Sequence, residues 1–330
     1  MPERVHHSQA STPLPATPRL VRLRRWGWIL LGILAGTTMV DRLWPNPDPA
    51  VAPEEPLSAR SLAAPVARPI TLLLIGSDAD RIGAASNGAA PLGPANSDAL
   101  LLLRVAAKTP PQLLALPTEL AVQLPGRGTP QALGSLYREG GVALAAEAIQ
   151  ELLDLERGQP DRYLVISRGA LRQLIDGLGT IEANPDRTMS YHDKRLNYRI
   201  QIQGGLQQFN GNQVEQLLRY RDESGPVALA GPGRRQRQQQ LASSLLLQMG
   251  RPEQLAQLPP LLAQLKAEVD TNLSQGEALS LLATLLSDPQ TLRFSQLPLA
   301  AAKDRQQPLR QLAAGAPKPL WPKLEPQPRP

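Results

Sequence analysis

The sequence predicts an α/β layered domain that follows one N-terminal transmembrane helix. Between residues 70 and 300, apolar runs of strand length alternate with helical patterns, and continuous apolar runs are typical of strands covered on both faces. Near the N-terminus, the stretch Trp26–Val40 carries no charged side chain. The length of 330 residues allows one large domain with appendages, or two small domains.

The composition excludes several chemistries. The chain has no Cys, which excludes disulfides, Cys-ligated metal sites and a cysteine nucleophile. It has only 3 His, so a multi-histidine metal site or a Ser-His-Asp triad would need His192 at its centre. A net charge of +6 permits phosphate contacts, but only 3% of the residues are aromatic, which argues against base stacking. We therefore expect no nucleic-acid partner.

The charge-free stretch has the flanks of a membrane anchor. Extended to Trp44, it approaches the roughly 20 residues that a bilayer requires, with tryptophans at both ends. An arginine cluster precedes it, which predicts that residues 1–25 form a cytoplasmic basic segment. We predict a single-pass signal anchor at 26–44 in the cytoplasmic (inner) membrane, with the main domain exported. The alternative, a cleaved signal peptide, lacks a clear small-x-small cleavage site.

Two segments outside the expected domain are rich in proline. Residues 45–69 combine Pro and Ala without apolar periodicity, which is typical of an extended linker. Residues 301–330 have no repeating apolar face and are expected to form a disordered tail. The folded domain is then expected at 70–300.

Within that domain the elements follow from apolar periodicity. The expected elements are strands at 70–75, 100–105, 113–116 and 163–166 and helices at 142–155 and 170–175. Ser274 and Glu277 form a capping-box pattern, which predicts a further helix start. The stretch 269–274 is expected to be a strand end followed by this cap. This alternation predicts a sheet packed against helices.

Two aspartates flank the first two expected strands. Asp78 lies just past the first strand, and Asp98 lies just before the second. Ligand groups gather at strand ends in open α/β sheets, so the two carboxylates could share a hard cation such as Mg²⁺. In the alternative interpretation, which is the more common one for such residues, both are turn or cap residues.

Basic residues gather after a helix expected at 211–218. This helix runs into Arg219 and Arg221, whose side chains can converge on one ligand only if the helix ends there. A second helix is expected to open at Gly233, which places Arg234 and Gln238 on one face near its N-terminus.

Such a group of guanidinium forks, with a divalent cation nearby, suits a pyrophosphate. The alternative is a solvated basic helix that pairs with Glu215, Asp222 and Glu223.

These residues carry a family resemblance. The motifs GSDAD, NSD, LPTEL, SLYREGG, LIDGLGTI, FNGNQVEQLLRYR, GRRQRQ and VDTNLS occur in an order that resembles the LytR-CpsA-Psr (LCP) family over about residues 70–297. The most specific stretch, Phe209–Arg221, aligns with the block L-N-G-x-x-A-L-x-Y-v-R-x-R of that family. A match to G-R-x-x-R-Q follows at Gly233–Gln238.

The resemblance implies an extracytoplasmic, Mg²⁺-dependent phosphotransferase. Members of the family move a glycopolymer from an undecaprenyl-pyrophosphate carrier onto peptidoglycan. The implied fold is a three-layer α/β/α sandwich with a central mixed sheet, in which the lipid fills an apolar tunnel. The implied metal ligands are Asp78 and Asp98, the implied pyrophosphate-binding residues are Arg219, Arg221, Arg234 and Gln238, and the implied catalytic residues are Arg219, Arg221 and Asp98.

The chain departs from the family pattern at four positions. Asp80 stands where the family has Arg, and the Pro-Arg-Asp triplet has Thr118 in place of its arginine. Asn96 stands where the family has Arg or a similar residue, and Gly231 stands where the family has an acidic residue. These changes leave a second hypothesis open, a degenerate member that binds polyprenyl phosphate or wall polymer as an envelope scaffold or regulator.

Overall fold

The structure of the chain is a computed structural model, and it describes residues 57–84, 94–193, 198–220, 227–300 and 309–322. The segments predicted as the cytoplasmic segment and the anchor, 1–25 and 26–44, lie outside these ranges. Among the described helices, none combines the length and the apolar character that a membrane span requires.

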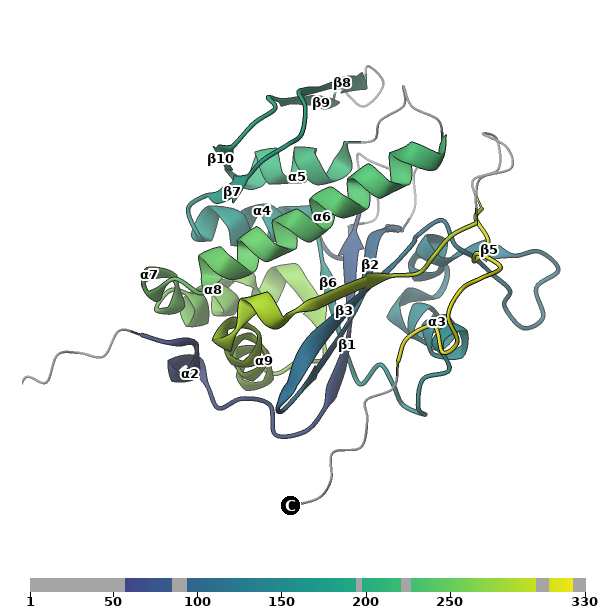
Figure 1. Cartoon of the computed structure of the whole chain (residues 1–330), viewed down its shortest axis with the longest axis horizontal. Helices are drawn as coiled ribbons and strands as arrows, with labels where there is room; N and C mark the ends of the chain where they lie inside the picture. Colours follow the sequence, from purple (N-terminus) through teal and green to yellow (C-terminus); the bar gives the residue numbers. More distant parts are fainter. Residues whose placement is uncertain (1–56, 85–93, 194–197, 221–226, 301–308, 323–330) are drawn as a thin grey trace, which may run out of the picture. The chain divides into compact units, whose positions relative to one another are not determined.

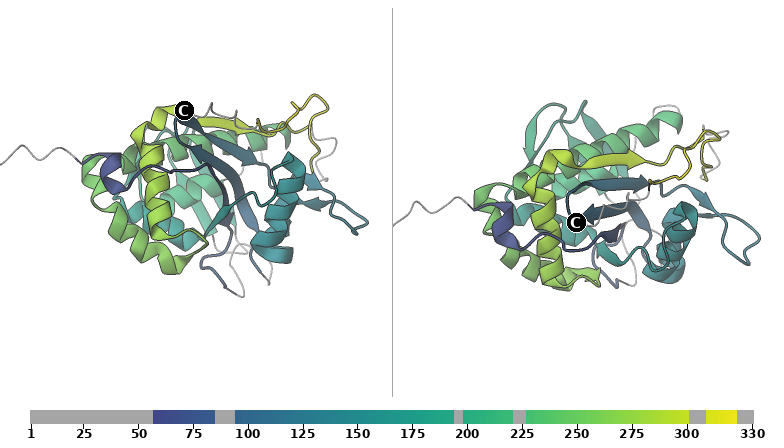
Figure 2. Two further views of the ribbon diagram at one scale, coloured as in Figure 1. Left: turned by 90° about the horizontal axis from the view of Figure 1, so that it is seen from below. Right: turned by 60° about the horizontal axis from the view of Figure 1, so that its bottom comes forward.

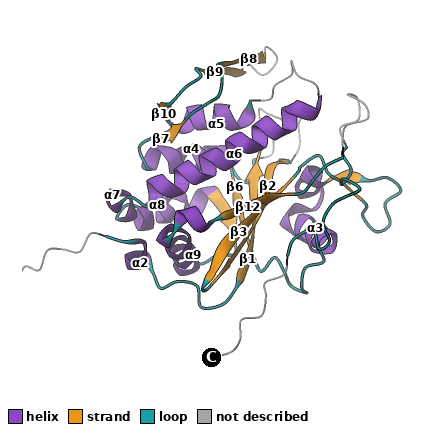
Figure 3. Ribbon diagram, viewed as in Figure 1, coloured by secondary structure: helices purple, strands orange, loops and turns teal. Residues whose placement is uncertain are grey.

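A mixed six-stranded sheet forms the centre of the domain (Figures 1 and 3). Its spatial order is β11-β6-β1-β2-β3-β12. The strands are β1 (Ile70–Ser77), β2 (Ser97–Ala106), β3 (Thr109–Leu116), β6 (Arg162–Ile166), β11 (Val269–Thr271) and β12 (Arg293–Gln296). The pairs β1–β2, β2–β3 and β6–β11 are antiparallel, while β1–β6 and β3–β12 are parallel. The predicted strands and the mixed sheet are confirmed.

Helices flank this sheet on both faces (Figure 2). They are α2 (Ala59–Leu62), α3 (Leu136–Leu153), α4 (Arg168–Gly177), α5 (Gly211–Arg219), α6 (Val227–Met249), α7 (Pro252–Leu255), α8 (Leu258–Leu265) and α9 (Gln275–Ser287). The short strands β4 (Ala121–Val122) and β5 (Gln131–Ala132), β7 (Ile181–Ala183) and β10 (Gln207–Phe209), and β8 (Met189–Asp193) and β9 (Tyr198–Ile202) form three small ladders.

Alternation along β1 shows how the layers are held together. Leu73 and Ile75 pack in the cluster that contains the inner side of α3. Ile70 and Leu72 point the other way and pack with α9. Side chains of a strand alternate between its faces, so this mostly apolar strand is buried by both helical layers, as the sequence predicts.

Local signals fix several helix ends. The predicted capping box of α9 is present, since the Ser274 hydroxyl oxygen accepts from the Glu277 backbone N–H and the Glu277 carboxylate accepts from the Ser274 backbone N–H. The helix predicted at 142–155 is the second part of α3. Gly141 separates it from the first part because its φ of +65° breaks the helical path, a conformation that glycine adopts without a steric penalty.

The predicted start of α6 is wrong. The helix begins at Val227 rather than at Gly233, so Arg234 and Gln238 do not lie in its first turn. A Gly- and Pro-rich stretch that includes Pro232 precedes Gly233, and a proline inside a helix removes one backbone donor and usually marks a boundary. Here the helix continues through it.

The C-terminal segment differs from the expected disordered tail over residues 309–322. Arg310 forms a β-bridge with Leu120, and Trp321 is only 3% exposed. The guanidinium carbon of Arg104, a buried strand residue, lies 3.7 Å from the centre of the Trp321 ring, and its Nη1 donates to the Pro322 carbonyl at 2.5 Å. A buried guanidinium needs polar or aromatic partners, and the segment supplies them.

We predict that Trp321→Ala lowers the free energy of unfolding by about 3–5 kcal/mol, because it removes a buried aromatic ring and the cover of Arg104. Urea denaturation measures this change. The control is Leu206→Ala, at a side chain that is 67% exposed, which should change stability by no more than about 0.5 kcal/mol. Equal midpoints for the two variants would contradict the packing of this segment.

The ion pair between β6 and α9 makes stability depend on pH. Hydrogen bonds from Arg162, at 2.6 Å, and from the Ser274 backbone lower the pKa of Glu277 to about 2. A carboxylate with a lowered folded-state pKa stabilises the fold above its ordinary pKa of 4.5. We expect this contribution to disappear as the pH falls from 4.5 toward 2, and we expect Glu277→Gln to flatten the dependence of the urea midpoint over that window.

Candidate functional site

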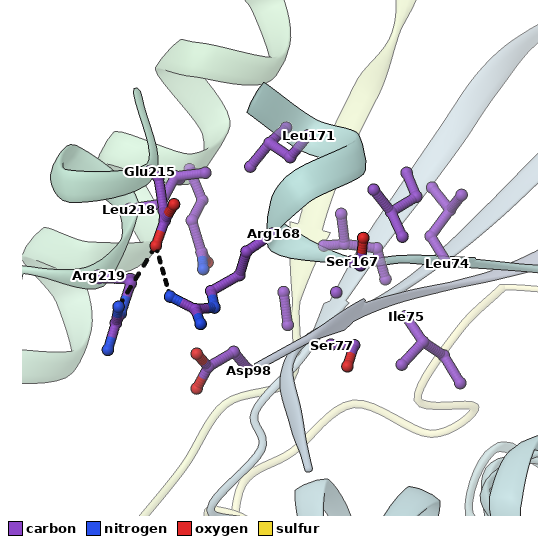
Figure 4. Close-up of a pocket in the computed structure, with 15 residues that line it drawn as sticks. Leu74, Ile75, Ser77, Asp98, Ser167, Arg168, Leu171, Glu215, Leu218 and Arg219 are labelled. Atoms are coloured by element: carbon purple, nitrogen blue, oxygen red, sulfur yellow. Dashed lines mark hydrogen bonds and ion pairs between the residues drawn. The ribbon is translucent and has the colours of Figure 1, made fainter. Parts of the chain in front are cut away.

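A cavity of about 200 Å³ lies where β1 ends and β2 begins, between the sheet and helices α4, α5 and α6 (Figure 4). Its walls are mostly apolar, and polar side chains gather on one side of it. The apolar wall includes Leu74, Ile75, Leu101, Ile166, Leu171 and Leu218. The polar side is formed by the charged residues Asp98, Arg168, Glu215 and Arg219, which lie together in Figure 4, and the further polar residues of the lining are Ser77, Ser167 and Gln238.

The carboxylate of Glu215 organises the polar side. It is 3% exposed, and three guanidinium groups contact it. Arg168 Nη1 lies 2.8 Å from Oε1, Arg219 Nη1 lies 3.3 Å from the same oxygen, and Arg172 Nη1 bonds to Oε2. Asp80 receives a second bond from Arg172, at 2.5 Å. A buried carboxylate is stable only when it is paired, so these arginines are held in place by Glu215.

Helix geometry explains why these residues meet. Arg168 and Arg172 are four residues apart on α4 and share a face, as Glu215 and Arg219 do on α5. The two helices approach closely at Gly211, where a Cβ atom would lie 2.4 Å from the Arg172 carbonyl oxygen. Only glycine fits there, and one turn further along α5 Glu215 reaches the arginines of α4.

The electrostatics keep Glu215 ionised. Burial by itself raises the pKa of this carboxyl, but the hydrogen bond from Arg172 and the charge of Arg168 outweigh burial and hold the pKa below its ordinary value. The ring of Tyr198, 4.0 Å from the guanidinium carbon of Arg219, orients this side chain further. Arg168 and Arg219 line the cavity together with the carboxylates of Glu215 and Asp98, so donors that can bind an anion lie beside acidic groups at this end.

The structure places some of the predicted pyrophosphate residues at this cavity. Arg219 and Gln238 both line it. Helix α5 ends at Arg219, and Tyr220 leaves the helical conformation, which agrees with the helix end predicted from the sequence. Arg221 lies outside the described residues, and Arg234 belongs to α6 with its side chain outside the described part.

Asp78 and Asp98 occupy the same edge of the sheet, because β1 and β2 are antiparallel and Ser77 lies opposite Ser97. Asp98 lines the cavity, and Figure 4 shows its carboxylate on the same side as the guanidinium groups. Asp78 is buried, and its Oδ1 accepts from the Asn96 backbone N–H at 2.9 Å. At least this oxygen of Asp78 therefore stabilises a turn, as the alternative interpretation expects.

Within the described ranges there is no cluster of three or more potential metal-ligating side chains. Two carboxylates completed by phosphate oxygens and water are nevertheless a donor set that suits Mg²⁺.

Sequence reasoning missed Arg168 and the role of Glu215. The alternative interpretation does list Glu215 as a partner of the basic helix, and Arg219 confirms that pairing. One signal was available, since Glu215 stands where the aligned family block has Leu.

Arg237 was also missed. It is buried and donates to the carbonyls of Leu217 at 3.3 Å and Tyr220 at 2.7 Å, which ties α6 to the end of α5.

A second cavity of about 390 Å³ adjoins the first beneath α6. The two share Leu101 and Gln238 in their linings. The second extends over Leu113 of β3 and Phe294 of β12. Together they provide space between α6 and the sheet that runs from a charged end to an apolar and amide-lined end.

We predict that Glu215→Gln lowers the free energy of unfolding by about 3–5 kcal/mol, because buried guanidinium groups lose their counter-charge. Urea denaturation at neutral pH is the measurement. Asp80→Asn is the matched control, since it also removes a carboxylate bonded to Arg172, but one that is 53% exposed, and should cost no more than about 1 kcal/mol. A loss of similar size in both variants would contradict the central role of Glu215.

Known proteins that resemble this chain agree with what the geometry of the site indicates. The chain is 28% identical over 183 residues to a probable cell wall biosynthesis protein, LcpB, of Corynebacterium glutamicum, a match that covers 53% of this chain and 40% of that protein. It is 24% identical over 191 residues to the polyisoprenyl-teichoic acid–peptidoglycan teichoic acid transferase TagV of Bacillus subtilis, covering 56% and 47%. The chain thus spans about half the length of these relatives or less.

The crystal structure of B. subtilis TagV is similar in fold, with a TM-score of 0.59 at 19% identity, over 75% of this chain and 92% of that one. The model of the LytR_cpsA_psr family matches residues 49–312, most of the chain. The protein therefore belongs to the LytR-CpsA-Psr family.

Proposed function

We propose that the protein is an extracytoplasmic phosphotransferase that moves a glycopolymer from a polyprenyl-pyrophosphate carrier to peptidoglycan. The observation that carries this proposal is the cavity, which combines an apolar wall with arginines fixed at one end. A lipid diphosphate has the same division into an apolar chain and an anionic head. The transferase activity of the relative TagV supports the reaction class.

Apolar space beneath α6 suits the lipid. The first cavity is lined mostly by apolar side chains, and the adjoining one adds Leu113 of β3 and Phe294 of β12 beside glutamine amides such as that of Gln239. Burying apolar surface contributes about 25 cal/mol per Å², so a polyprenyl chain gains affinity along such a wall without directional contacts. The charged end then fixes the register of the diphosphate.

At the charged end, the proposed ligands of the diphosphate oxygens are the side chains of Arg219, Arg221, Arg234 and Gln238. Asp98, with Asp78, would hold Mg²⁺, which would neutralise charge on the diphosphate and polarise it. The acceptor hydroxyl of peptidoglycan attacks the phosphorus next to the sugar, the phosphoanhydride bond breaks, polyprenyl phosphate leaves, and the hydroxyl proton passes to water. The arginines bind the leaving phosphate most strongly as its charge develops, which lowers the barrier.

We propose that the predicted membrane anchor places this site next to the membrane. Segment 26–44 would hold the protein in the cytoplasmic membrane with its N-terminus inside. The flanking arginines and tryptophans support this orientation. The domain would then face the compartment in which peptidoglycan lies, next to the membrane that carries the polyprenyl substrate.

A second candidate function is a carrier-lipid or wall-polymer binder without turnover. It is favoured by Asp80, whose carboxylate is 2.5 Å from Arg172 at a position where the family has an arginine. Thr118 removes a further arginine of the family pattern. Losing a charge-assisted contact to a buried phosphate costs about 1.5–3 kcal/mol, so these replacements bear on the rate as well as on binding.

The test is a transfer assay with the full-length chain in mild detergent, a short polyprenyl-pyrophosphate sugar and peptidoglycan oligomers, with and without Mg²⁺. We expect Mg²⁺-dependent transfer that Asp98→Ala abolishes. The Arg219→Ala, Arg221→Ala double variant should also lose binding of the lipid diphosphate. Arg127→Gln is the control, because this arginine pairs with Glu139 at an exposed site and should not affect transfer.

Three outcomes separate the hypotheses. Transfer lost in Asp98→Ala and retained in Arg127→Gln supports the transferase. Tight binding of the lipid diphosphate without transfer supports the second candidate. Unchanged binding in the double arginine variant would contradict the assignment of the site.

A further inference from the structure

The side chain of Arg168 has a buried donor without a partner. It is 14% exposed, its Nη1 bonds to Glu215, and its Nε has no hydrogen-bond partner among the described residues. Buried donors in proteins are nearly always satisfied, and leaving one unpaired costs stability. Arg168 also lines the cavity, and in Figure 4 its guanidinium group lies on the same side as Asp98. The orphaned donor therefore belongs to the site where a ligand would bind.

The geometry of the guanidinium group indicates what this ligand is. Glu215 occupies Nη1, so the edge formed by Nε and Nη2 faces away from that carboxylate. An arginine edge of two parallel N–H groups binds two oxygens of a phosphate or carboxylate side by side. The backbone N–H groups of Arg168 and Gly169 donate to the carbonyl oxygens of Ala79 and Asp80. At the start of α4 a ligand is therefore contacted by the Arg168 side chain and not by these two amides.

A shared oxygen places Arg168 next to Arg219. Both donate to Oε1 of Glu215, at 2.8 Å and 3.3 Å. Two guanidinium groups bonded to one oxygen atom lie close enough to bind the two phosphate groups of one diphosphate. Among the described residues that line the cavity, these two are the basic ones.

We infer that Arg168 binds a phosphate oxygen of the lipid diphosphate through its Nε–Nη2 edge, beside Arg219, and so makes the site select a diphosphate over a monophosphate. This inference rests on the proposed function, since it names a further residue that recognises the same ligand. Glu215 is the positioning residue that aims both arginines.

A purely structural role for Arg168 predicts something different. In that case Arg168 only neutralises Glu215, and Arg172, which contacts the other oxygen of this carboxylate, is equivalent to it. Arg172 extends toward Asp80 and lines a separate surface depression rather than the cavity. The pair Arg168 and Arg172 therefore separates ligand binding from neutralisation of Glu215.

The test is calorimetric titration of the full-length chain with geranyl pyrophosphate and with geranyl monophosphate. We expect Arg168→Gln to weaken binding of the pyrophosphate about 10- to 100-fold and that of the monophosphate much less, so that the preference for the diphosphate is lost. Arg168→Lys, which keeps the charge but not the fork, should restore only part of it. Arg172→Gln should lower the melting temperature while the preference persists.

The matched control is Arg162→Gln, which removes an arginine from another partly buried pair, with Glu277, at the opposite end of β6. It should leave both affinities unchanged. Melting curves of every variant with and without ligand show that the compared proteins are folded.

Two results would overturn the inference. If the wild type binds the pyrophosphate and Arg168→Gln keeps its preference, or if Arg172→Gln loses the preference equally, Arg168 does not contact the diphosphate, and the proposed function stands. If the wild type binds neither lipid, the inference and the proposed function fail together.

Discussion

The buried carboxylate of Glu215 is the constraint on which the site depends. A carboxylate that is 3% exposed must be paired, and Arg168 and Arg172 of α4 with Arg219 of α5 provide the pairs. This requirement fixes how α4 and α5 pack and aims two guanidinium groups at one cavity. The site is thus preorganised before any ligand arrives, which avoids the free-energy cost of ordering long side chains on binding.

The sheet supplies the other half of the site. The antiparallel pair β1–β2 brings Asp78 and Asp98 to the same edge, while Leu74 and Leu101 of the same strands line the apolar wall. Acidic, basic and apolar groups therefore meet at one end of two neighbouring strands. Such a division suits an amphipathic anion, because each part of the ligand meets the surroundings that it prefers.

Local sequence patterns predicted the fold well. Apolar runs marked β1, β2, β3 and β6, and a capping box marked α9, because these signals depend on neighbours in the chain. The tail was different, since the packing of Trp321 depends on Arg104, 217 positions earlier, which no periodicity reveals. Arg168 was missed for the same reason, as its partner Glu215 is 47 residues away. Arg219 could be predicted from the sequence because it lies at a helix end within a specific motif.

The most direct test of this account is a crystal structure of the protein with geranyl pyrophosphate bound. We predict that the diphosphate lies between Arg168 and Arg219, on the side of the cavity where Asp98 lies, with the isoprenoid chain along Leu74 and Leu101. A diphosphate bound elsewhere, with Arg168 and Arg219 still turned only toward Glu215, would contradict it.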